Sequence, residues 1–392
     1  MSYTLGVIAF AVGLLLSVML HEAGHFTTAK AFGMKASRFF VGFGPTLWSF
    51  RRGETEYGVK ALPFGGFVKI DGMTSLEEIA PEDEARAFYR QPPGRRTIVL
   101  CAGSFVHFVI AILLVFGILA ATGKDPIRTN GLQVAGVSKC LTASGAGSCT
   151  GAPAAPAYGV FRSGDVLLSI DGLTLDSSGL NFVQTLRHHP GQPATIVYQR
   201  DGTTRTVVMT PVPLTVGHQV EGRIGLQTEP NAAHVSVSGA FGRTFSLLGD
   251  FIKETGSAIS GLPHEVHQVF AGEQRGGTSA ASIVDVARVS GQISSSGASV
   301  GDIIASLLLI LAELNLFFGL FNLLPLLPMD GGHVAILGFE EGRTRLYRTI
   351  GRRDPGRVDI MKVLPLTYAL FAALVGLSLI LLYAGITNPI RL

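Results

Sequence analysis

Charged side chains are scarce in this sequence of 392 residues, since Asp, Glu, Lys and Arg together make up only 15%. Hydrophobic residues account for 47%, so the composition indicates a membrane protein with soluble parts. The net charge is +3, and the sequence lacks a basic stripe interleaved with aromatic residues. That absence argues against a nucleic-acid partner. Inverted internal repeats are also lacking, which argues against a metal or proton transporter.

Four apolar segments are long enough to cross a lipid bilayer, at about residues 5–29, 97–121, 303–324 and 363–384. The first lacks the basic region and the small-residue cleavage site of a secretory signal, so we expect it to be retained. Lys and Arg are concentrated in the loop between the first two segments and in the loop between the last two. By the positive-inside rule, these loops should be cytoplasmic, and both termini and the long central segment should be extracytoplasmic.

The most informative stretch lies at the inner end of the first apolar segment, where His21, Glu22 and His25 occur together. On a helix, the two histidines lie one turn apart on the same face and can share one tetrahedral metal ion, for which zinc is expected. Glu22 projects about 100° around the helix from His21, where its carboxylate can take a proton from a water activated at the metal. This is the arrangement of a zinc protease. The alternatives are a polar helix end at the membrane surface and a proton relay.

The end of the third apolar segment supplies a third candidate ligand. Pro325 and Pro328 should end the helix at membrane depth, which is tolerated where the backbone lines a wet cavity. Asp330, in an Asp-Gly-Gly turn, can then face the metal and leave one position for water. Asn322 should lie about two turns from Asp330, with donors for a substrate carbonyl or oxyanion. His333 is a weaker candidate ligand than Asp330.

Other polar residues in the apolar segments are less informative. His107 has no partner at ligand spacing, so it is expected to be packed or hydrogen-bonded rather than to bind the metal. Asn315 should share a helix face with Asn322 by its i, i+7 spacing. The intramembrane Glu313 receives no role.

Between the first two apolar segments, the pattern predicts short strands at about 39–41, 47–51, 54–61 and 66–70, then a surface helix at 75–89. A free strand edge could pair with an unwound substrate, and the turn containing Phe64, Gly65 and Gly66 would let the two backbones approach closely. The alternative is a hairpin that rests on the membrane without touching substrate.

The central segment resembles a PDZ domain. Gly164-Asp165 precedes alternating apolar residues and Asp171-Gly172, and these are followed by a helix at 178–188 and strands around an Asp201-Gly202 turn. Such a domain could bind an extended peptide or could act only as a steric gate. The nearby Cys140 and Cys149 are compatible with an extracytoplasmic disulfide, whereas Cys101 should be a buried thiol. An amphipathic helix is expected at 241–262, and an irregular region with a short helix at 281–289 follows.

Together, these motifs resemble the site-2 protease family of intramembrane zinc metalloproteases. The resemblance rests on His21-Glu-Ala-Gly-His25 and on the Asn322, Pro325 and Asp330-Gly-Gly pattern. The loops Val41-Gly-Phe-Gly-Pro45 and Pro63-Phe-Gly-Gly66 are similar to those of the bacterial regulator-of-sigma branch, and residues 40–49 and the cysteine pair are similar to its actinobacterial members. The resemblance implies one zinc per chain on His21, His25 and Asp330, with Glu22 as general base. It also implies cleavage of a single-pass membrane protein, such as an anti-sigma factor that another protease has trimmed.

The sequence thus predicts a multi-pass α-helical membrane protein with four transmembrane helices, a membrane-associated cytoplasmic β-sheet and an extracytoplasmic PDZ-like α/β domain. It is expected to reside in the cell membrane, with its active site toward the cytoplasmic leaflet. The expected parts in chain order are transmembrane helix 1 (1–30), the β region (31–95), transmembrane helix 2 (96–122), the PDZ-like domain (126–230), an amphipathic helix and loop (231–300), transmembrane helix 3 (301–329), a cytoplasmic segment (330–362) and transmembrane helix 4 (363–386).

Overall fold

The computed structural model describes residues 2–73, 77–141, 149–175, 180–216, 219–271, 282–296, 298–353, 356, 358 and 360–387. The chain forms two compact units. The first, here called the helical unit, comprises Met1–Ile118 and Phe241–Leu392. The second, here called the central unit, comprises Leu119–Ala240. Each unit is described by itself below.

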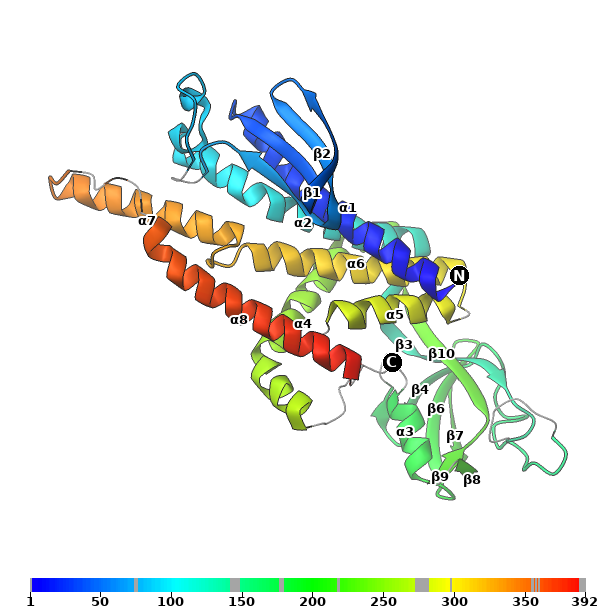
Figure 1. The fold of residues 1–392 in the computed structure, drawn as a ribbon. Helices are drawn as coiled ribbons and strands as arrows, with labels where there is room; N and C mark the ends of the chain where they lie inside the picture. The colour runs from blue at the N-terminus through cyan, green and yellow to red at the C-terminus, as the bar shows by residue number, and fades with distance from the viewer. Residues whose placement is uncertain are drawn as a thin grey trace. The chain divides into compact units, whose positions relative to one another are not determined.

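Among the described residues, four helices are long and apolar enough to cross a membrane, as the sequence predicts. They are α1 (Tyr3–Ala31), α2 (Pro93–Thr122), α6 (Val300–Asn322) and α8 (Ile360–Thr387) (Figure 1). One face of α1 leaves an apolar stripe exposed, which consists of Leu5, Ile8, Val12 and Leu16. Its opposite face carries the buried Ser17, His21 and His25. The exposed apolar face is suited to contact with lipid, whereas the polar side chains lie on the buried face.

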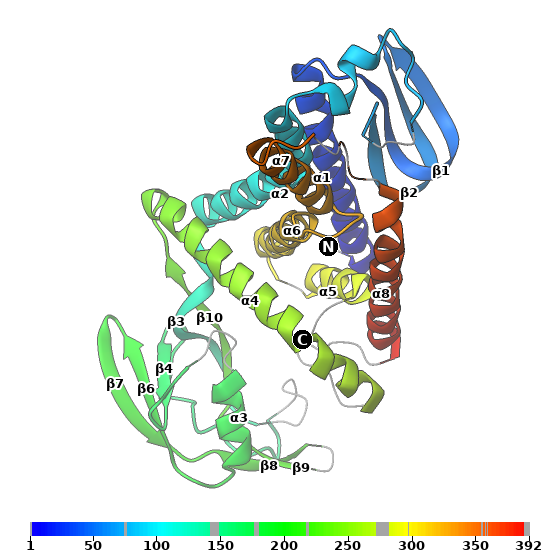
Figure 2. The same cartoon turned by 90° about the vertical axis from the view of Figure 1, so that its left-hand side faces the viewer.

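The residues after α1 form one long antiparallel hairpin, β1 (Ala36–Arg52) and β2 (Thr55–Ile70), which packs against α1. Figure 2 shows the two long strands of this hairpin beside that helix. The four segments expected to be strands, at about 39–41, 47–51, 54–61 and 66–70, all lie within β1 and β2, which continue through most of the glycines that suggested breaks. Residues 38–41 pair both with 66–69 and with 56–59, so the hairpin folds back on itself. At Gly42 the backbone adopts φ 83°, and a Cβ there would lie 2.5 Å from the carbonyl oxygen of Leu62. Glycine therefore lets the hairpin bulge and bend without ending.

The predicted surface helix at 75–89 is also wrong within the described residues, which form two short 3₁₀ turns, η1 (Glu84–Arg86) and η2 (Phe88–Arg90). Tertiary contacts explain the difference. Phe88 is buried in a cluster with Ala29, Met34 and Leu100, and Lys35 pairs with Asp83. These contacts anchor the acidic segment to the base of α1 rather than leaving it as a free amphipathic helix.

The remaining helices of the helical unit are longer than the sequence suggests. α4 (Val237–Ala271) extends beyond the expected amphipathic helix in both directions, and α5 (Ile283–Ser295) replaces the expected short helix. The cap of α5 is a reciprocal pair of hydrogen bonds between Ser282 and Asp285. The helix α7 (Asp330–Thr349) was not predicted. In both views α1 runs beside α5 and α6 (Figures 1 and 2).

The central unit is a small α/β unit. Its main sheet has the strand order β10-β3-β4-β6-β7, with β5 paired to β4, and β8 and β9 form a separate hairpin. The strands are β3 (Lys124–Val137), β4 (Val166–Ile170), β5 (Leu173–Thr174), β6 (Ala194–Arg200), β7 (Thr203–Met209), β8 (Val212–Val216), β9 (Gln219–Arg223) and β10 (Leu226–His234), with the helix α3 (Leu180–His188). The start of the helix predicted at 178–188 lies outside the described residues. Leu167, Ile196 and Phe182 belong to one buried core.

Two features of the central unit follow the sequence closely. Asp201 and Gly202 have φ 51° and 76° and connect β6 to β7, which is the turn that an Asp-Gly pair favours. Cys140 and Cys149 form a disulfide. Cys101 on α2 is a free, half-buried thiol.

Candidate active site

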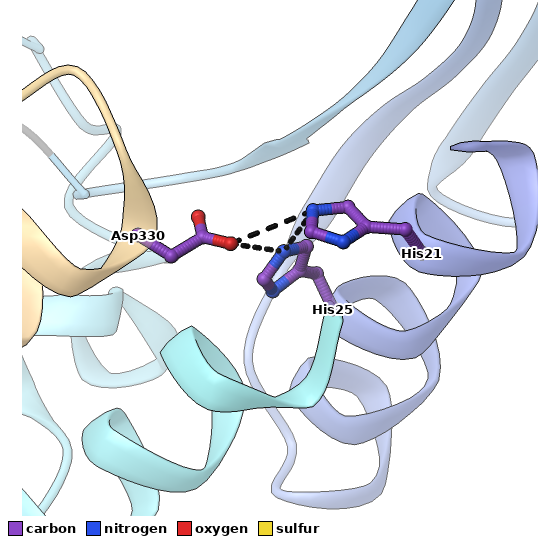
Figure 3. Close-up of side chains that lie close together, drawn as sticks. All are labelled: His21, His25 and Asp330. Atoms are coloured by element: carbon purple, nitrogen blue, oxygen red, sulfur yellow. Dashed lines mark hydrogen bonds and ion pairs between the residues drawn. The ribbon is translucent and has the colours of Figure 1, made fainter. Parts of the chain in front are cut away.

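Three side chains from opposite ends of the chain converge in the helical unit. His21 and His25 project from α1, and Asp330 projects from the first turn of α7 (Figure 3). The two Nε2 atoms are 3.1 Å apart. Oδ2 of Asp330 lies 3.5 Å from Nε2 of His21 and 3.3 Å from Nε2 of His25. The sequence therefore named three residues that the structure brings together.

The protonation of His25 indicates what this cluster can hold. Its Nδ1 lies 2.7 Å from the carbonyl oxygen of Val99 on α2, so Nδ1 donates a hydrogen and Nε2 carries a lone pair when the ring is neutral. Oδ2 of Asp330, which is buried without a hydrogen bond, faces this lone pair. Two electron-rich atoms at such a distance repel each other unless a cation joins them.

The distances also fit a tetrahedral zinc site. Ligand atoms about 2.0–2.1 Å from a tetrahedral zinc lie roughly 3.3–3.4 Å from one another. The three distances within the cluster are 3.1, 3.3 and 3.5 Å. Two imidazole nitrogens and one carboxylate oxygen are a donor set that zinc accepts, and they leave one coordination position open. The residues present therefore fit the ion that the sequence suggested.

The break after α6 places Asp330. The helix ends at Asn322, before Pro325, and a new helix begins at Asp330, as expected from two prolines that cannot continue a helix. The Asp-Gly-Gly turn needs its glycines because the chain doubles back tightly. A Cβ at Gly331 would lie 2.2 Å from the carbonyl oxygen of Leu323, and one at Gly332 would lie 2.6 Å from the backbone nitrogen of Leu327.

A second pair of glycines, Gly24 and Gly103, makes room for the imidazoles. Gly24 lies inside the His21–His25 motif, whereas Gly103 was not identified from the sequence. A Cβ at Gly103 on α2 would lie 2.4 Å from Nε2 of His25 and 2.5 Å from Cε1 of His21. A Cβ at Gly24 would lie 2.8 Å from the carbonyl oxygen of Ala102. The two helices can approach only because both positions lack a side chain. The Ala-Gly-Ser run at 102–104 in an apolar span is the available signal, because small residues mark helix contacts in membranes.

Glu22 faces a cavity of about 280 Å³ between α1, α2, α6 and α7. Its Oε2 accepts a hydrogen bond of 3.0 Å from the backbone N–H of Val68 on β2. This bond joins the carboxylate to the hairpin, a link that the sequence does not suggest. The cavity is lined by residues from all four helices and from the loop before α7, which are Val18, His21, Glu22, His107, Phe318, Asn322, Pro328, Met329 and Asp330.

The other candidate residues take different places. Asn322 lines the cavity, whereas Pro325 is exposed in the loop before Asp330 and is not among the lining residues. Phe64 is 77% exposed on β2. Gly65 has φ 90°, and a Cβ at Gly66 would lie 2.5 Å from Sδ of Met19 on α1. This part of β2 therefore lies against the helix that carries the histidines.

His107 is hydrogen-bonded, as predicted. Its Nδ1 lies 2.8 Å from Oδ1 of Asn315 on α6. Its ring is 4.8 Å from that of His21, and it lines the same cavity. A partner 208 residues away in the chain cannot be found by local spacing. Glu313 is exposed on α6 and lies outside the cavity lining.

Comparison with known proteins decides the family. Residues 9–353 match the model of peptidase family M50. The chain belongs to this family. It is 35% identical to the zinc metalloprotease Rip1 of Mycobacterium tuberculosis and 35% identical to Rip1 of Mycolicibacterium smegmatis, in both cases over 100% of each chain. It is thus a zinc metalloprotease of the M50 family and a site-2 protease of the actinobacterial type.

The M50 assignment agrees with the four apolar helices, which together support a location in a membrane. Among solved structures, the PDZ domain of an SdrC-like protein from Listeria monocytogenes matches 26% of this M50 chain and 93% of its own length, with 18% identity and a TM-score of 0.20. A TM-score this low carries no fold assignment.

Proposed function

We propose that this chain is an intramembrane endopeptidase that hydrolyses one peptide bond within the transmembrane segment of a single-pass membrane protein. The convergence of His21, His25 and Asp330 beside Glu22, in a cavity between apolar helices, is the observation that carries the proposal. Ionisable side chains at membrane depth are costly, so a cluster of this kind is favoured as a functional site.

In this proposal, His21, His25 and Asp330 hold one zinc ion per chain, and zinc bound there supplies Lewis-acid polarisation of the scissile carbonyl and lowers the pKa of water. Glu22 acts as the general base, taking a proton from the attacking water and delivering it to the nitrogen of the departing amine. The hydrogen bond from Val68 fixes the direction of the carboxylate. Asn322, which lines the same cavity, donates a hydrogen bond to the substrate carbonyl or oxyanion.

Substrate delivery follows from the edge of the hairpin. Among the described residues, 66–69 of β2 pair with 38–41 of β1 on one side only, whereas 56–59 pair on both sides, so the edge of β2 that is free to pair lies at 66–69. The N–H of Val68 points from this edge to Glu22, and N–H groups two residues apart along a strand face the same side. The N–H of Gly66 therefore faces the same side as that of Val68. An unwound substrate segment that pairs along Phe64, Gly65 and Gly66 would then arrive beside Glu22.

The orientation and partners complete the proposal. The basic loops favour an orientation with the hairpin and the segment after Asp330 on the cytoplasmic side, and with both termini and the central unit outside the cell. Resemblance to regulator-of-sigma proteases favours a trimmed anti-sigma factor as substrate. The central unit, as a PDZ-like domain, either binds an extended peptide or screens substrates by their outer segment. Pro325 contributes to substrate binding by interrupting the helix after α6, at the place where the substrate enters.

The test compares wild type with Glu22→Gln, expressed with candidate single-pass membrane proteins and followed by mass-spectrometric mapping of the cleavage products. Because a general base contributes about 100- to 10,000-fold, Glu22→Gln should lose cleavage by that factor while keeping its zinc. Glu313→Gln, which removes an acid outside the cavity from an apolar helix, serves as the matched control. Cleavage by Glu22→Gln at the wild-type rate would exclude the mechanism, and ion transport without proteolysis would exclude the function.

A further inference from the structure

The hydrogen bonds around Asn315 have a fixed direction. Nδ2 of Asn315 lies 2.7 Å from the carbonyl oxygen of Leu311 and 3.0 Å from Oγ of Ser17. A carbonyl oxygen only accepts, so the amide nitrogen must face Leu311 and Oδ1 must face His107. The hydroxyl of Ser17 donates in turn to the carbonyl oxygen of Gly13 at 3.0 Å, so it is free to accept from Asn315. Because the carbonyl oxygens of Leu311 and Gly13 can only accept, the directions of these hydrogen bonds are determined.

This arrangement determines the tautomer of His107. Oδ1 of Asn315 can only accept a hydrogen bond, so Nδ1 of His107, 2.8 Å away, must carry the hydrogen. In the neutral ring Nε2 then carries a lone pair. His107 and Asn315 are 2% and 0% exposed, respectively, so neither ring nor amide is free to turn over in solvent. With Nδ1 occupied by Asn315, Nε2 is the nitrogen that remains for the cavity.

We propose that Nε2 of His107 accepts a hydrogen bond from the N–H of the scissile peptide bond, with Asn315 and Ser17 acting as positioning residues for its ring. This inference rests on the proposed proteolytic function and adds a substrate contact to it. Three other polar groups in the cavity wall have different proposed roles. Glu22 transfers the proton, Asn322 donates to the carbonyl oxygen of the scissile bond, and Asp330 belongs to the metal cluster. The scissile N–H needs an acceptor, which His107 supplies beside His21.

The contact favours bond cleavage as well as binding. An unwound substrate loses the helical acceptor of its N–H, and a buried N–H without a partner is costly. When the C–N bond breaks, the nitrogen gains a proton and becomes an amine with more N–H groups. A fixed lone pair stabilises this developing amine more than the starting amide. Replacement of His107 should therefore lower kcat more than it raises KM.

The experiment uses two forms of one membrane-segment peptide that the purified full-length wild type cleaves in detergent micelles. One form has the normal scissile amide, and the other has an ester at that bond, which has no N–H to donate. His107→Leu should lower kcat/KM for the amide about tenfold to hundredfold, as expected when a hydrogen bond to a group that gains charge is lost. The same variant should change cleavage of the ester less than about threefold. His107→Gln, whose amide offers both a donor and an acceptor, should recover part of the loss.

Controls separate this contact from a structural role. Ser104→Ala removes a buried hydroxyl without a hydrogen bond from the same helix and should leave both substrates unaffected. Zinc content and thermal unfolding of each variant show whether the protein is intact. If Asn315 acts only through His107, Asn315→Leu combined with His107→Leu should be no worse on the amide than His107→Leu alone.

The outcomes distinguish the inference from the function on which it rests. Equal losses on amide and ester, or no loss on the amide, would overturn the role of His107 while leaving the protease intact. If the wild type cleaves no membrane-segment peptide, the proposed function fails first. A variant that loses its zinc or unfolds is replaced by His107→Gln, for which the same comparison of amide with ester decides.

Discussion

Replacement of Gly103 by alanine tests how α1 and α2 together hold the site. The new Cβ would lie 2.4 Å from Nε2 of His25, 2.5 Å from Cε1 of His21 and 2.6 Å from Nδ1 of His21. Non-bonded carbon and nitrogen atoms need about 3.5 Å, so the rings or the helix must move by about 1 Å. His25 cannot swing away without losing its 2.7 Å hydrogen bond to Val99. The strain therefore falls on the two ligand atoms rather than on a flexible side chain.

The expected magnitude follows from that displacement. A shift of about 1 Å in a reacting group can cost about 100-fold in rate, and disturbed orientation of a metal ligand lowers metal affinity by about 10- to 100-fold. Gly103→Ala should thus lose zinc and at least about 100-fold in cleavage rate. The overall fold should persist, because alanine is favoured over glycine in a helix by about 1 kcal/mol.

Gly117→Ala is the matched control, since it lies on the same helix with nothing within 4 Å of a new Cβ. Zinc is measured in the purified protein by mass spectrometry, cleavage with a membrane-segment peptide, and integrity by thermal unfolding. If Gly103→Ala kept wild-type zinc and activity, the two helices would not be packed as described, and the account of the site would fail.

Two further predictions concern the metal and acid stability. Removal of zinc with a chelator should abolish cleavage, and added zinc should restore it. The Asp330→Asn variant should need at least about tenfold more zinc for the same activity. If Asp330→Asn recovered its activity at the zinc concentration that restores the wild type, Asp330 would not be a ligand. In the central unit, burial would raise the pKa of Asp165, but hydrogen bonds from Arg200 and from the N–H of Arg162 lower it below its usual value. A lowered folded pKa stabilises the unit above the unfolded pKa of about 4 and loses this effect as the pH falls below it. Hydrogen exchange of the wild-type central unit should therefore show a loss of protection below about pH 4, and the Asp165→Asn variant should not show this loss. An equal loss of protection in the wild type and the variant would contradict the prediction.

The parts of the site that could be predicted are those in which chemistry is encoded by local spacing. His21, Glu22 and His25 lie within two turns of one helix, so the period of the helix alone shows that two imidazoles share a face. Asp330 could be added because two prolines and two glycines require irregular backbone there. Such signals depend on covalent neighbours, and the structure brings the three candidate ligand residues together.

The parts that could not be predicted depend on contacts between helices. Neither His107 nor Asn315 carries a local sign of the other, and Gly103 reads as an ordinary small residue until the rings behind it are seen. The hairpin shows the same division. Its four strand segments could be predicted from their residues, but the pairing of 38–41 with both 66–69 and 56–59 could not, because it depends on contacts across the sheet.

These contacts share one feature, which is that each reaches the buried face of α1 from a different element. Val68 of β2 holds Glu22, Val99 of α2 orients His25, Asn315 of α6 binds Ser17, and Asp330 of α7 faces the two histidines. Within α1 itself, Ser17 donates to the carbonyl oxygen of Gly13, but the other polar groups named here find their partners on other elements, so the site cannot form before those elements pack. In the proposed function, displacement of β2 by an arriving substrate would alter the Glu22 carboxylate without changing the proposed metal ligands. The proposed substrate pairing at the hairpin edge and the orientation of the proposed general base would thus be linked through one hydrogen bond, from the N–H of Val68 to Glu22.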